Sequence, residues 1–274
     1  MSSGKLYVVG TPIGNLGDFS PRAASVLEGV DFIAAEDTRV SVKLLNHFGI
    51  KKPMISYFEH NKLLKGEMII DRILKGESCA IVTDAGMPAI SDPGEELVDL
   101  AHKNGIKVES VPGPSAIVTA LAISGLPSGR FCFEGFLSVN KVSRKKHLEE
   151  IKTESRTLIF YEAPHKLCNT LKDLYASLGE RNIAVVKELT KIHETVLRTS
   201  LSSAIEYFED NKPQGEFVLI IEGARKSEEK VYTIKEAASI AKGLIEKGMP
   251  PTEATKEAAK ITGFKKGEIY KEIL

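Results

Sequence analysis

Short apolar runs alternate along this chain with amphipathic segments, and this alternation limits the possible folds more than any other feature. Strand–helix–strand repeats of this kind are typical of a parallel sheet with helices on both faces. The sequence therefore predicts a doubly wound α/β domain over residues 1–112. Its expected strands are 5–9, 32–35, 79–83 and 107–111, and its expected helices are 21–28, 40–48, 62–74 and 95–104.

A second α/β set follows, and we assign it to a domain of residues 113–226 with a more mixed sheet. A charged stretch then leads to short helical patterns broken by Gly and Pro, which predict a small helix-turn-helix-like extension over residues 227–274. The expected strands are 156–161, 183–187 and 217–222, and the expected helices are 116–124, 165–178, 201–208, 234–247, 252–260 and 265–274.

Gly/Pro-rich turns follow apolar runs at residues 10–18, 83–88, 111–116 and 215–216. Such turns expose backbone N–H and C=O groups at the ends of strands, where open α/β sheets bind ligands. We therefore expect the four turns to form the walls of one cleft.

The first turn invites a dinucleotide-binding interpretation, but its glycine spacing is neither GxGxxG nor a P-loop. Pro12 also lacks the N–H that a pyrophosphate would use. A purely structural tight turn is the other simple interpretation. In the second turn we interpret Asp84 as a ligand acceptor, whereas Asp92 is better placed to cap the helix expected to begin near residue 95.

The formal net charge is zero, with 37 basic and 37 acidic residues, so a polyanionic partner must be met by a local patch. One segment concentrates basic side chains. It is either a solvated helix face or a phosphate-contacting surface. Its candidate RNA-binding residues are Lys141, Arg144, Lys145 and Lys146.

Three scattered cysteines predict buried, reduced thiols, and no metal-ligand spacing is visible, so we expect no metal. Neither a signal peptide nor an apolar run of about 20 residues is evident, which predicts a cytoplasmic protein without a membrane span.

Polar and charged residues concentrate where strands are expected to end, at 35–39, 58–61, 160–165 and 189–194. Surface caps and ion pairs would explain many such clusters. Their density at strand ends and scarcity in helices is nevertheless typical of an active site.

Seven motifs together resemble the tetrapyrrole-methylase superfamily of S-adenosylmethionine enzymes, and within it the ribosomal branch. The resemblance spans residues 5–224 in order. Met87 departs from it, because the branch often has Thr there. The motifs are VGTPIGNLGDFS (9–20), AEDTR (35–39), TDAGMPAISDPG (83–94), VPGPSA (111–116), EGFL (134–137), FYEAPH (160–165) and LTKIHE (189–194).

The resemblance implies two α/β domains that bind the methyl donor S-adenosylmethionine between them, in a homodimer. The implied donor contacts are Pro12, Asp84, Ala85, Gly86, Ile90, Ser115, Ala116, Tyr161, Glu162, Leu189, Gly215, Glu216 and Phe217.

The resemblance further implies methyl transfer to the ribose 2′-oxygen of a decoding-region cytidine in 16S rRNA, within the 30S subunit. We expect a carboxylate or imidazole to take the hydroxyl proton, and a cation to lie near the phosphates or the oxyanion. The basic segment and the terminal helices would contact RNA. The candidate bases and orienting groups are Asp37, His60, Glu162 and His165, and the candidate cations are Arg39 and Lys191.

Two alternatives stay open. The same fold and donor could serve a tetrapyrrole precursor, which zero net charge favours slightly, although the motifs at 35–39, 160–165 and 189–194 and the helical extension oppose it. The chain could instead be a non-catalytic RNA-binding protein that has kept the fold.

Overall fold

The computed structural model describes residues 4–225 and 232–273. The chain forms two compact units, residues 1–224 and residues 225–274. The larger unit holds two five-stranded sheets, and the smaller unit is helical. The predicted start of the extension at residue 227 lies outside the described residues.

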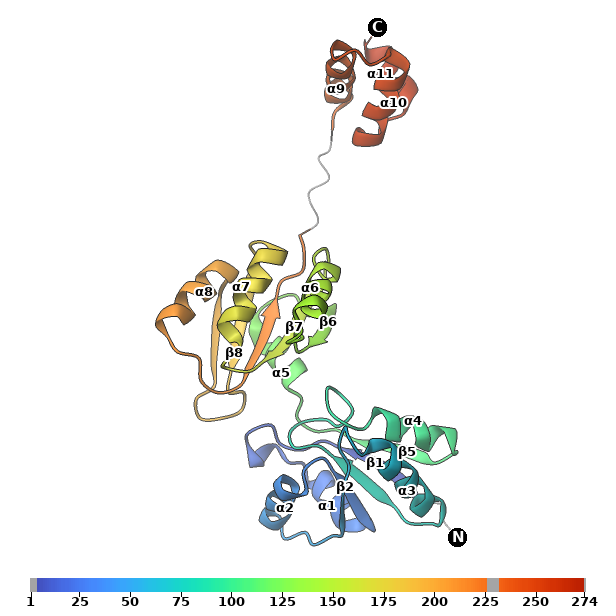
Figure 1. The fold of residues 1–274 in the computed structure, drawn as a ribbon, viewed down its shortest axis with the longest axis vertical. Helices are drawn as coiled ribbons and strands as arrows, with labels where there is room; N and C mark the ends of the chain where they lie inside the picture. Colours follow the sequence, from blue (N-terminus) through green and yellow to red (C-terminus); the bar gives the residue numbers. More distant parts are fainter. Residues whose placement is uncertain (1–3, 226–231, 274) are drawn as a thin grey trace. The chain divides into compact units, whose positions relative to one another are not determined.

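The first sheet is entirely parallel, with strand order β3-β2-β4-β1-β5. One apolar cluster lies between the sheet and α3 and α4, and another lies between the sheet and α1 and α2 (Figure 1). The predicted doubly wound arrangement is confirmed. Its strands are β1 (Lys5–Val9), β2 (Phe32–Ala35), β3 (Met54–Ser56), β4 (Cys79–Val82) and β5 (Lys107–Val111), and its helices are α1 (Pro21–Gly29), α2 (Thr38–His47), α3 (Lys62–Leu74) and α4 (Glu95–Lys103).

The second sheet is mixed, as predicted, with strand order β6-β7-β10-β8-β9. Only β6 and β7 pair in parallel, and the other neighbours are antiparallel. Helices α6, α7 and α8 cover one face, and α5 covers the other (Figure 1). The strands are β6 (Phe131–Gly135), β7 (Thr157–Glu162), β8 (Asn182–Lys187), β9 (Thr195–Ser200) and β10 (Phe217–Ile221), and the helices are α5 (Ala116–Ser124), α6 (Lys141–Glu150), α7 (Leu167–Leu178) and α8 (Leu201–Asp210).

The smaller unit consists of α9 (Ile234–Glu246), α10 (Pro251–Thr262) and α11 (Lys266–Ile273), which confirms the predicted helical extension. Thr233 and Glu236 form a reciprocal capping box at the start of α9. Small side chains dominate the interface between the helices, so their backbones can approach closely. The fully buried residues of its apolar cluster are Ala237, Ala241, Ala258 and Ile269.

All three cysteines are free. Cys79 is buried as predicted, whereas Cys132 and Cys168 are only partly buried. Within residues 4–225 and 232–273, every helix is too short or too polar to cross a membrane.

Candidate functional site

The first and second Gly/Pro turns are joined by a pair of backbone hydrogen bonds. The Thr11 amide donates to the Gly86 carbonyl at 2.9 Å, and the Gly86 amide donates to the Thr11 carbonyl at 3.1 Å. The Thr11 hydroxyl also donates to the Thr83 carbonyl at 3.1 Å. The ends of β1 and β4 are therefore fixed to one another.

The third turn packs directly on the first. A Cβ placed on Gly10 would lie 2.6 Å from the Gly113 Cα, which leaves no room for a side chain at either position. The Gly10 amide donates to the Val111 carbonyl at 3.1 Å. Three of the four predicted turns thus meet at the carboxyl edge of the first sheet.

The first turn also contacts the turn after β8 in the second sheet. A Cβ on Gly14 would lie 2.6 Å from the Lys191 Cγ. The Lys191 ammonium group donates to Glu188 and to Glu216, each at 2.9 Å. Lys191 therefore ties the turn at 188–191 to the fourth predicted turn at 215–216.

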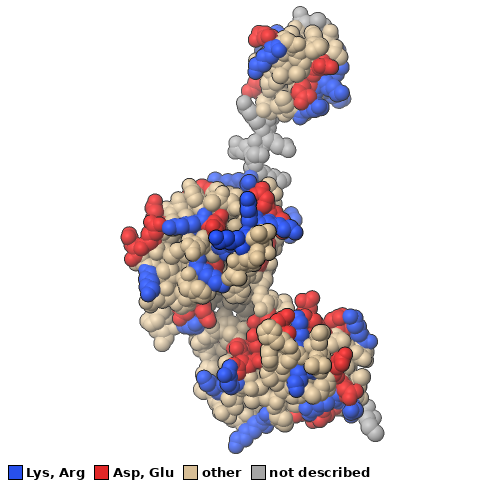
Figure 2. Space-filling model, in the orientation of Figure 1, with Lys and Arg blue, Asp and Glu red and all other residues tan. Residues whose placement is uncertain are grey.

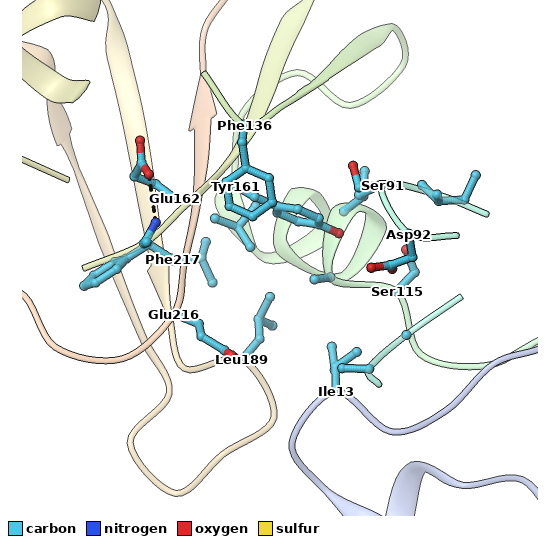
Figure 3. Close-up of a pocket in the computed structure, with 18 of the residues that line it drawn as sticks. Ile13, Ser91, Asp92, Ser115, Phe136, Tyr161, Glu162, Leu189, Glu216 and Phe217 are labelled. Carbon is cyan, nitrogen blue, oxygen red and sulfur yellow. Dashed lines mark hydrogen bonds between the residues drawn. The ribbon is translucent and has the colours of Figure 1, made fainter. Parts of the chain in front are cut away.

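A cavity of about 410 Å³ opens among these turns and the ends of β7 and β10 (Figure 3). The four predicted turns contribute to one pocket, although the fourth does so through Glu216 rather than Gly215. Most of the predicted donor contacts line it: Ala85, Gly86, Ile90, Ser115, Ala116, Tyr161, Glu162, Leu189, Glu216 and Phe217.

The other three predicted donor contacts, Pro12, Asp84 and Gly215, are not among the lining residues. Asp84 instead accepts a hydrogen bond from the Asp37 amide at 3.2 Å. Gly215 has φ +86, and a Cβ there would collide with the Glu188 side chain at 2.5 Å. Gly215 thus makes room for the carboxylate that Lys191 binds.

Several lining residues were not among the donor contacts assigned from the sequence. Ile13 and Met87 belong to two of the turns that were predicted to form the cleft, and Met87 was noted only as a departure from the family motif. Asp92 was interpreted only as a helix cap. The additional lining residues are Ile13, Met87, Ser91, Asp92, Ile117, Phe136, Ala163, Pro164, Val186 and Val218.

Two aromatic side chains form one wall of this pocket. The rings of Phe136 and Tyr161 lie 5.5 Å apart and are tilted by 60°. In Figure 3 the Tyr161 hydroxyl points toward Asp92. Burial, together with the Asp92 charge, raises the pKa of Tyr161 to about 12, so this hydroxyl stays protonated at neutral pH.

The loop between β4 and α4 holds Asp92 in the cavity wall. The helix cap position is taken by Gly94, which has no side chain, so the expectation that Asp92 caps α4 is wrong. The pKa of Asp92 is raised to about 6, mainly by burial and to a lesser extent by the charge of Glu36. Asp92 is therefore a stronger base than an ordinary aspartate, yet it is ionised at neutral pH.

Backbone strain concentrates beside this pocket. Among the described residues, four that are not glycine have positive φ: Ala89 at 68° and Ser91 at 62°, then Glu188 at 53° and Thr190 at 64°. All four belong to the two loops that bound the cavity. Conformations of this kind persist where surrounding contacts enforce them, and they cluster at ligand sites.

Of the candidate catalytic residues, only Glu162 lines this pocket. It is 4% exposed, and its carboxylate accepts hydrogen bonds from the Ala163 amide at 2.8 Å and from the Thr170 hydroxyl. Its oxygens are therefore engaged within the fold. His165 is exposed, and His60 lines a second cavity that shares Ser91 and Asp92 with the first.

Asp37 and Arg39 bind one another at the start of α2. The Asp37 carboxylate accepts from the Arg39 amide at 2.8 Å and from its guanidinium at 2.6 Å. These bonds lower the pKa of Asp37 to about 2, so it is a weak base at neutral pH. The Arg39 side chain is 89% exposed.

The candidate RNA-binding residues lie on α6, and Figure 2 shows Lys and Arg side chains gathered over this part of the unit. Arg144 is only 15% exposed, and it donates to Asp173 at 2.6 Å and to Thr170 at 2.9 Å. Its guanidinium is therefore occupied. Lys141, Lys145 and Lys146 are exposed along the same helix.

No group of three or more His, Cys, Asp or Glu side chains within residues 4–225 and 232–273 has an arrangement that could hold a metal ion.

Residues 5–205 match the family model of the tetrapyrrole (corrin/porphyrin) methylases. A protein named ribosomal RNA small subunit methyltransferase I from Synechocystis is 44% identical over 97% of this chain and 96% of its own length. A protein of the same name from Xylella fastidiosa is 47% identical over 97% of this chain and 98% of its own length. Another, from Escherichia coli O157:H7, is 43% identical over 98% of this chain and 94% of its own length.

Solved structures share the fold at low sequence identity. A diphthine synthase superposes with a TM-score of 0.61 at 14% identity, covering 81% of this chain and 90% of its own. A uroporphyrin-III-C-methyltransferase from Thermus thermophilus superposes with a TM-score of 0.56 at 19% identity, covering 80% of this chain and 94% of its own. The converging turns, the full-length relatives and the family model together show that this chain belongs to the tetrapyrrole methylase family, among the relatives named ribosomal RNA small subunit methyltransferase I.

Proposed function

We propose that this protein is a methyltransferase that uses S-adenosylmethionine to methylate the ribose 2′-oxygen of a decoding-region cytidine in 16S rRNA of the 30S subunit. The observation that carries the proposal is the cavity at which four predicted turns and the Tyr161–Glu162 strand end converge. The names of the relatives, which match this chain over nearly its full length, support the rRNA substrate.

The cavity has the properties of a site for the methyl donor. Its volume of about 410 Å³ falls within the roughly 300–1,000 Å³ of small-molecule sites. Apolar groups such as Ile13, Ile90 and Leu189 suit the adenosyl group and the thioether chain. Backbone edges at Gly86 and the carboxylate of Asp92 provide polar and anionic partners for the amino and sulfonium groups.

When bound, S-adenosylmethionine supplies an electrophilic methyl group on a positively charged sulfur. The overall reaction forms a bond between the ribose oxygen and the methyl carbon and breaks the bond between that carbon and sulfur. It leaves a neutral thioether and releases the hydroxyl proton. The protein must therefore align the ribose oxygen and provide an acceptor for that proton.

We keep His60, Glu162, His165 and Asp37 as candidate bases or orienting groups. They differ in whether they face a cavity or are held by hydrogen bonds within the fold. His60 faces a cavity beside the donor pocket, whereas Glu162 is occupied by internal hydrogen bonds. Asp37 is held by Arg39, so we propose a structural role for Asp37.

Two cations remain candidates for phosphate contact. Arg39 is almost fully exposed beside the strand ends, whereas the Lys191 ammonium group is bound by two carboxylates. We therefore favour Arg39 for the substrate backbone and propose that Lys191 positions the turn beside the donor. The exposed lysines of α6 and the helices α9 to α11 would add sequence-independent contacts to the ribosomal particle.

The remaining features of the proposal are a homodimer in the cytoplasm, with domains of residues 1–112 and 113–226. The test is methyl transfer from labelled S-adenosylmethionine, offered separately to unmethylated 30S subunits and to a uroporphyrinogen. Label in the 16S rRNA supports the proposal. Label only in the tetrapyrrole would replace it with the small-molecule alternative, and absence of donor binding would favour a non-catalytic RNA-binding protein.

A further inference from the structure

A second cavity, of about 580 Å³, lies against the donor pocket at the carboxyl edge of the first sheet. Glu36 from the end of β2 and Phe58 and His60 from the loop after β3 line one side of it. Ser91 and Asp92 line both cavities. The two spaces therefore share part of one loop as a common wall.

The second cavity presents aromatic rings that are not needed for the core. The Phe58 side chain is 38% exposed, and its ring lies 6.2 Å from the His60 ring at 81°. Neither residue belongs to the apolar clusters of the first sheet. Exposed aromatic faces beside a catalytic pocket are the usual means of stacking an unpaired nucleobase.

The charge of this lining selects the part of a nucleotide that can enter. Five carboxylates line it, against one lysine, Lys62, which is bound by Glu59 and Glu96. Such a lining repels a phosphate but accepts hydrogen bonds from amino and hydroxyl groups. Cytosine offers an exocyclic amino group to a carboxylate, whereas uracil has a carbonyl oxygen in that position.

The common wall is held in a strained conformation. Ala89 and Ser91, which line the second cavity, both have positive φ, and Asp92, which lines both cavities, directly follows Ser91. Strain of this kind has to be offset by other contacts. The loop is therefore built to place Asp92 at the junction of the two cavities.

We propose that the second cavity is the site for the acceptor nucleoside, a cytidine extruded from the RNA, with its base at Phe58 and its ribose 2′-hydroxyl at Asp92. The inference rests on the function proposed above, which it deepens by assigning the acceptor site. The phosphates stay outside the acidic cavity, and Arg39 at the neighbouring strand end is exposed to meet them.

Asp92 then serves as the general base. The proton of the 2′-hydroxyl passes to a carboxylate oxygen of Asp92 as the ribose oxygen bonds to the methyl carbon, and the proton is later released to water. The raised pKa of Asp92 makes it a better proton acceptor than Asp37, whose pKa is lowered by Arg39.

The chain contains no tryptophan, so one introduced in the cavity gives an unambiguous signal. In a Phe58→Trp variant, a stacked base should quench the emission. The matched control is Leu64→Trp, on the neighbouring helix α3, where the side chain is 81% exposed and lies outside the cavity lining. Each variant is titrated with cytidine and with uridine.

Saturable quenching of the Phe58→Trp variant by cytidine, with roughly tenfold weaker binding of uridine, is the expected result, because uridine loses one hydrogen bond to a charged group. The Leu64→Trp variant should show no saturable quenching. The assignment would be overturned if the Phe58→Trp variant showed no quenching or only as much as the Leu64→Trp control. It would also be overturned if cytidine and uridine bound equally well.

A second measurement covers the case in which a tryptophan perturbs the loop. With 30S subunits as substrate, Phe58→Ala should raise KM for the subunit about tenfold while donor affinity stays unchanged, and Phe58→Tyr should restore KM. Unchanged KM in Phe58→Ala would contradict the inference. Because nucleoside binding needs no methyl transfer, failure of the proposed function and failure of this inference are distinguishable.

Discussion

Thr11 and Gly86 exchange two backbone hydrogen bonds, at 2.9 and 3.1 Å, and this pair joins the loops after β1 and β4. Gly86 has φ +93 and faces the donor pocket, and a Cβ there would lie 3.4 Å from the Ile13 Cγ2. The pairing thus places a residue that has no side chain against the cavity.

Gly86→Ala should weaken donor binding roughly tenfold or more, because an added methyl group in a packed site costs about 1–3 kcal/mol. Calorimetric titration with S-adenosylmethionine measures the effect. Gly49→Ala is the matched control, since Gly49 has φ +71 but open space around its Cβ position. Gly49→Ala introduces similar backbone strain. If Gly86→Ala and Gly49→Ala had equal donor affinities, Gly86 would not shape the site.

Gly10→Ala should destabilise the larger unit by about 1–3 kcal/mol, because its Cβ would meet the Gly113 Cα at 2.6 Å and the Met87 Sδ at 2.7 Å. A shift of several degrees in Tm is expected for a unit of this size. Gly129→Ala, which has no atom within 4 Å of its Cβ position, should leave Tm nearly unchanged. A Gly10→Ala Tm equal to that of this control would refute the close approach.

Single-turnover methyl transfer should fall about tenfold per pH unit below pH 6 and level off above it, because Asp92 must be ionised to accept a proton. Glu36 and Asp84 raise the pKa of Asp92, and the Tyr161 hydroxyl faces it from β7. The other ionisable side chains that line the two cavities are Glu59, His60, Lys62, Glu95 and Glu96 in the second cavity and Glu162 and Glu216 in the donor pocket.

In the Asp92→Asn variant, methyl transfer should be slow, and its rate should not depend on pH across this range. His60 lines the same cavity as Asp92, so His60→Gln is the control, and it should keep the inflection near pH 6. If the inflection disappears in His60→Gln and persists in Asp92→Asn, the base is His60 instead.

Asp92→Asn should also stabilise the protein at alkaline pH. The folded-state pKa of Asp92 is about 6, above the ordinary value of 3.8, so the folded state binds the proton more tightly than the unfolded state does. The contribution of Asp92 to the free energy of unfolding therefore falls as pH rises from about 4 to 6, and it stays at its lowest value above pH 6. Thermal unfolding should show a higher Tm for Asp92→Asn than for wild type at pH 8, and a small difference at pH 4. A lower Tm at pH 8 would contradict the burial of this charge.

Truncation after residue 225 should weaken binding to 30S subunits while leaving donor affinity unchanged. The helical unit has its own core of Ala237, Ala241, Ala258 and Ile269, and the residues that line the donor pocket all belong to the larger unit. Sedimentation with 30S subunits and calorimetry with S-adenosylmethionine measure the two affinities. Full subunit affinity after truncation would remove the proposed role of α9 to α11.

The fold followed from the sequence wherever periodicity was strong. The expected helices at 62–74 and 116–124 have the bounds of α3 and α5. The short strand β3 was missed because its three residues are only half-buried, and β6 and β9 were missed because both are partly exposed edge strands.

The pocket was predictable where turns follow strands, since the carboxyl ends of strands meet at one edge of a sheet. The role of Asp92 was not, because an aspartate just before a helix is the usual signature of a cap. Its raised pKa depends on burial and on Glu36, which is distant in sequence and adjacent only in the folded chain.

The most direct test of the central claim is nucleoside analysis of 16S rRNA from unmethylated 30S subunits incubated with this protein and labelled S-adenosylmethionine. We expect the label to be recovered as 2′-O-methylcytidine from one decoding-region position. Label on a base, on another nucleoside, or absent from the rRNA while the donor still binds would contradict it.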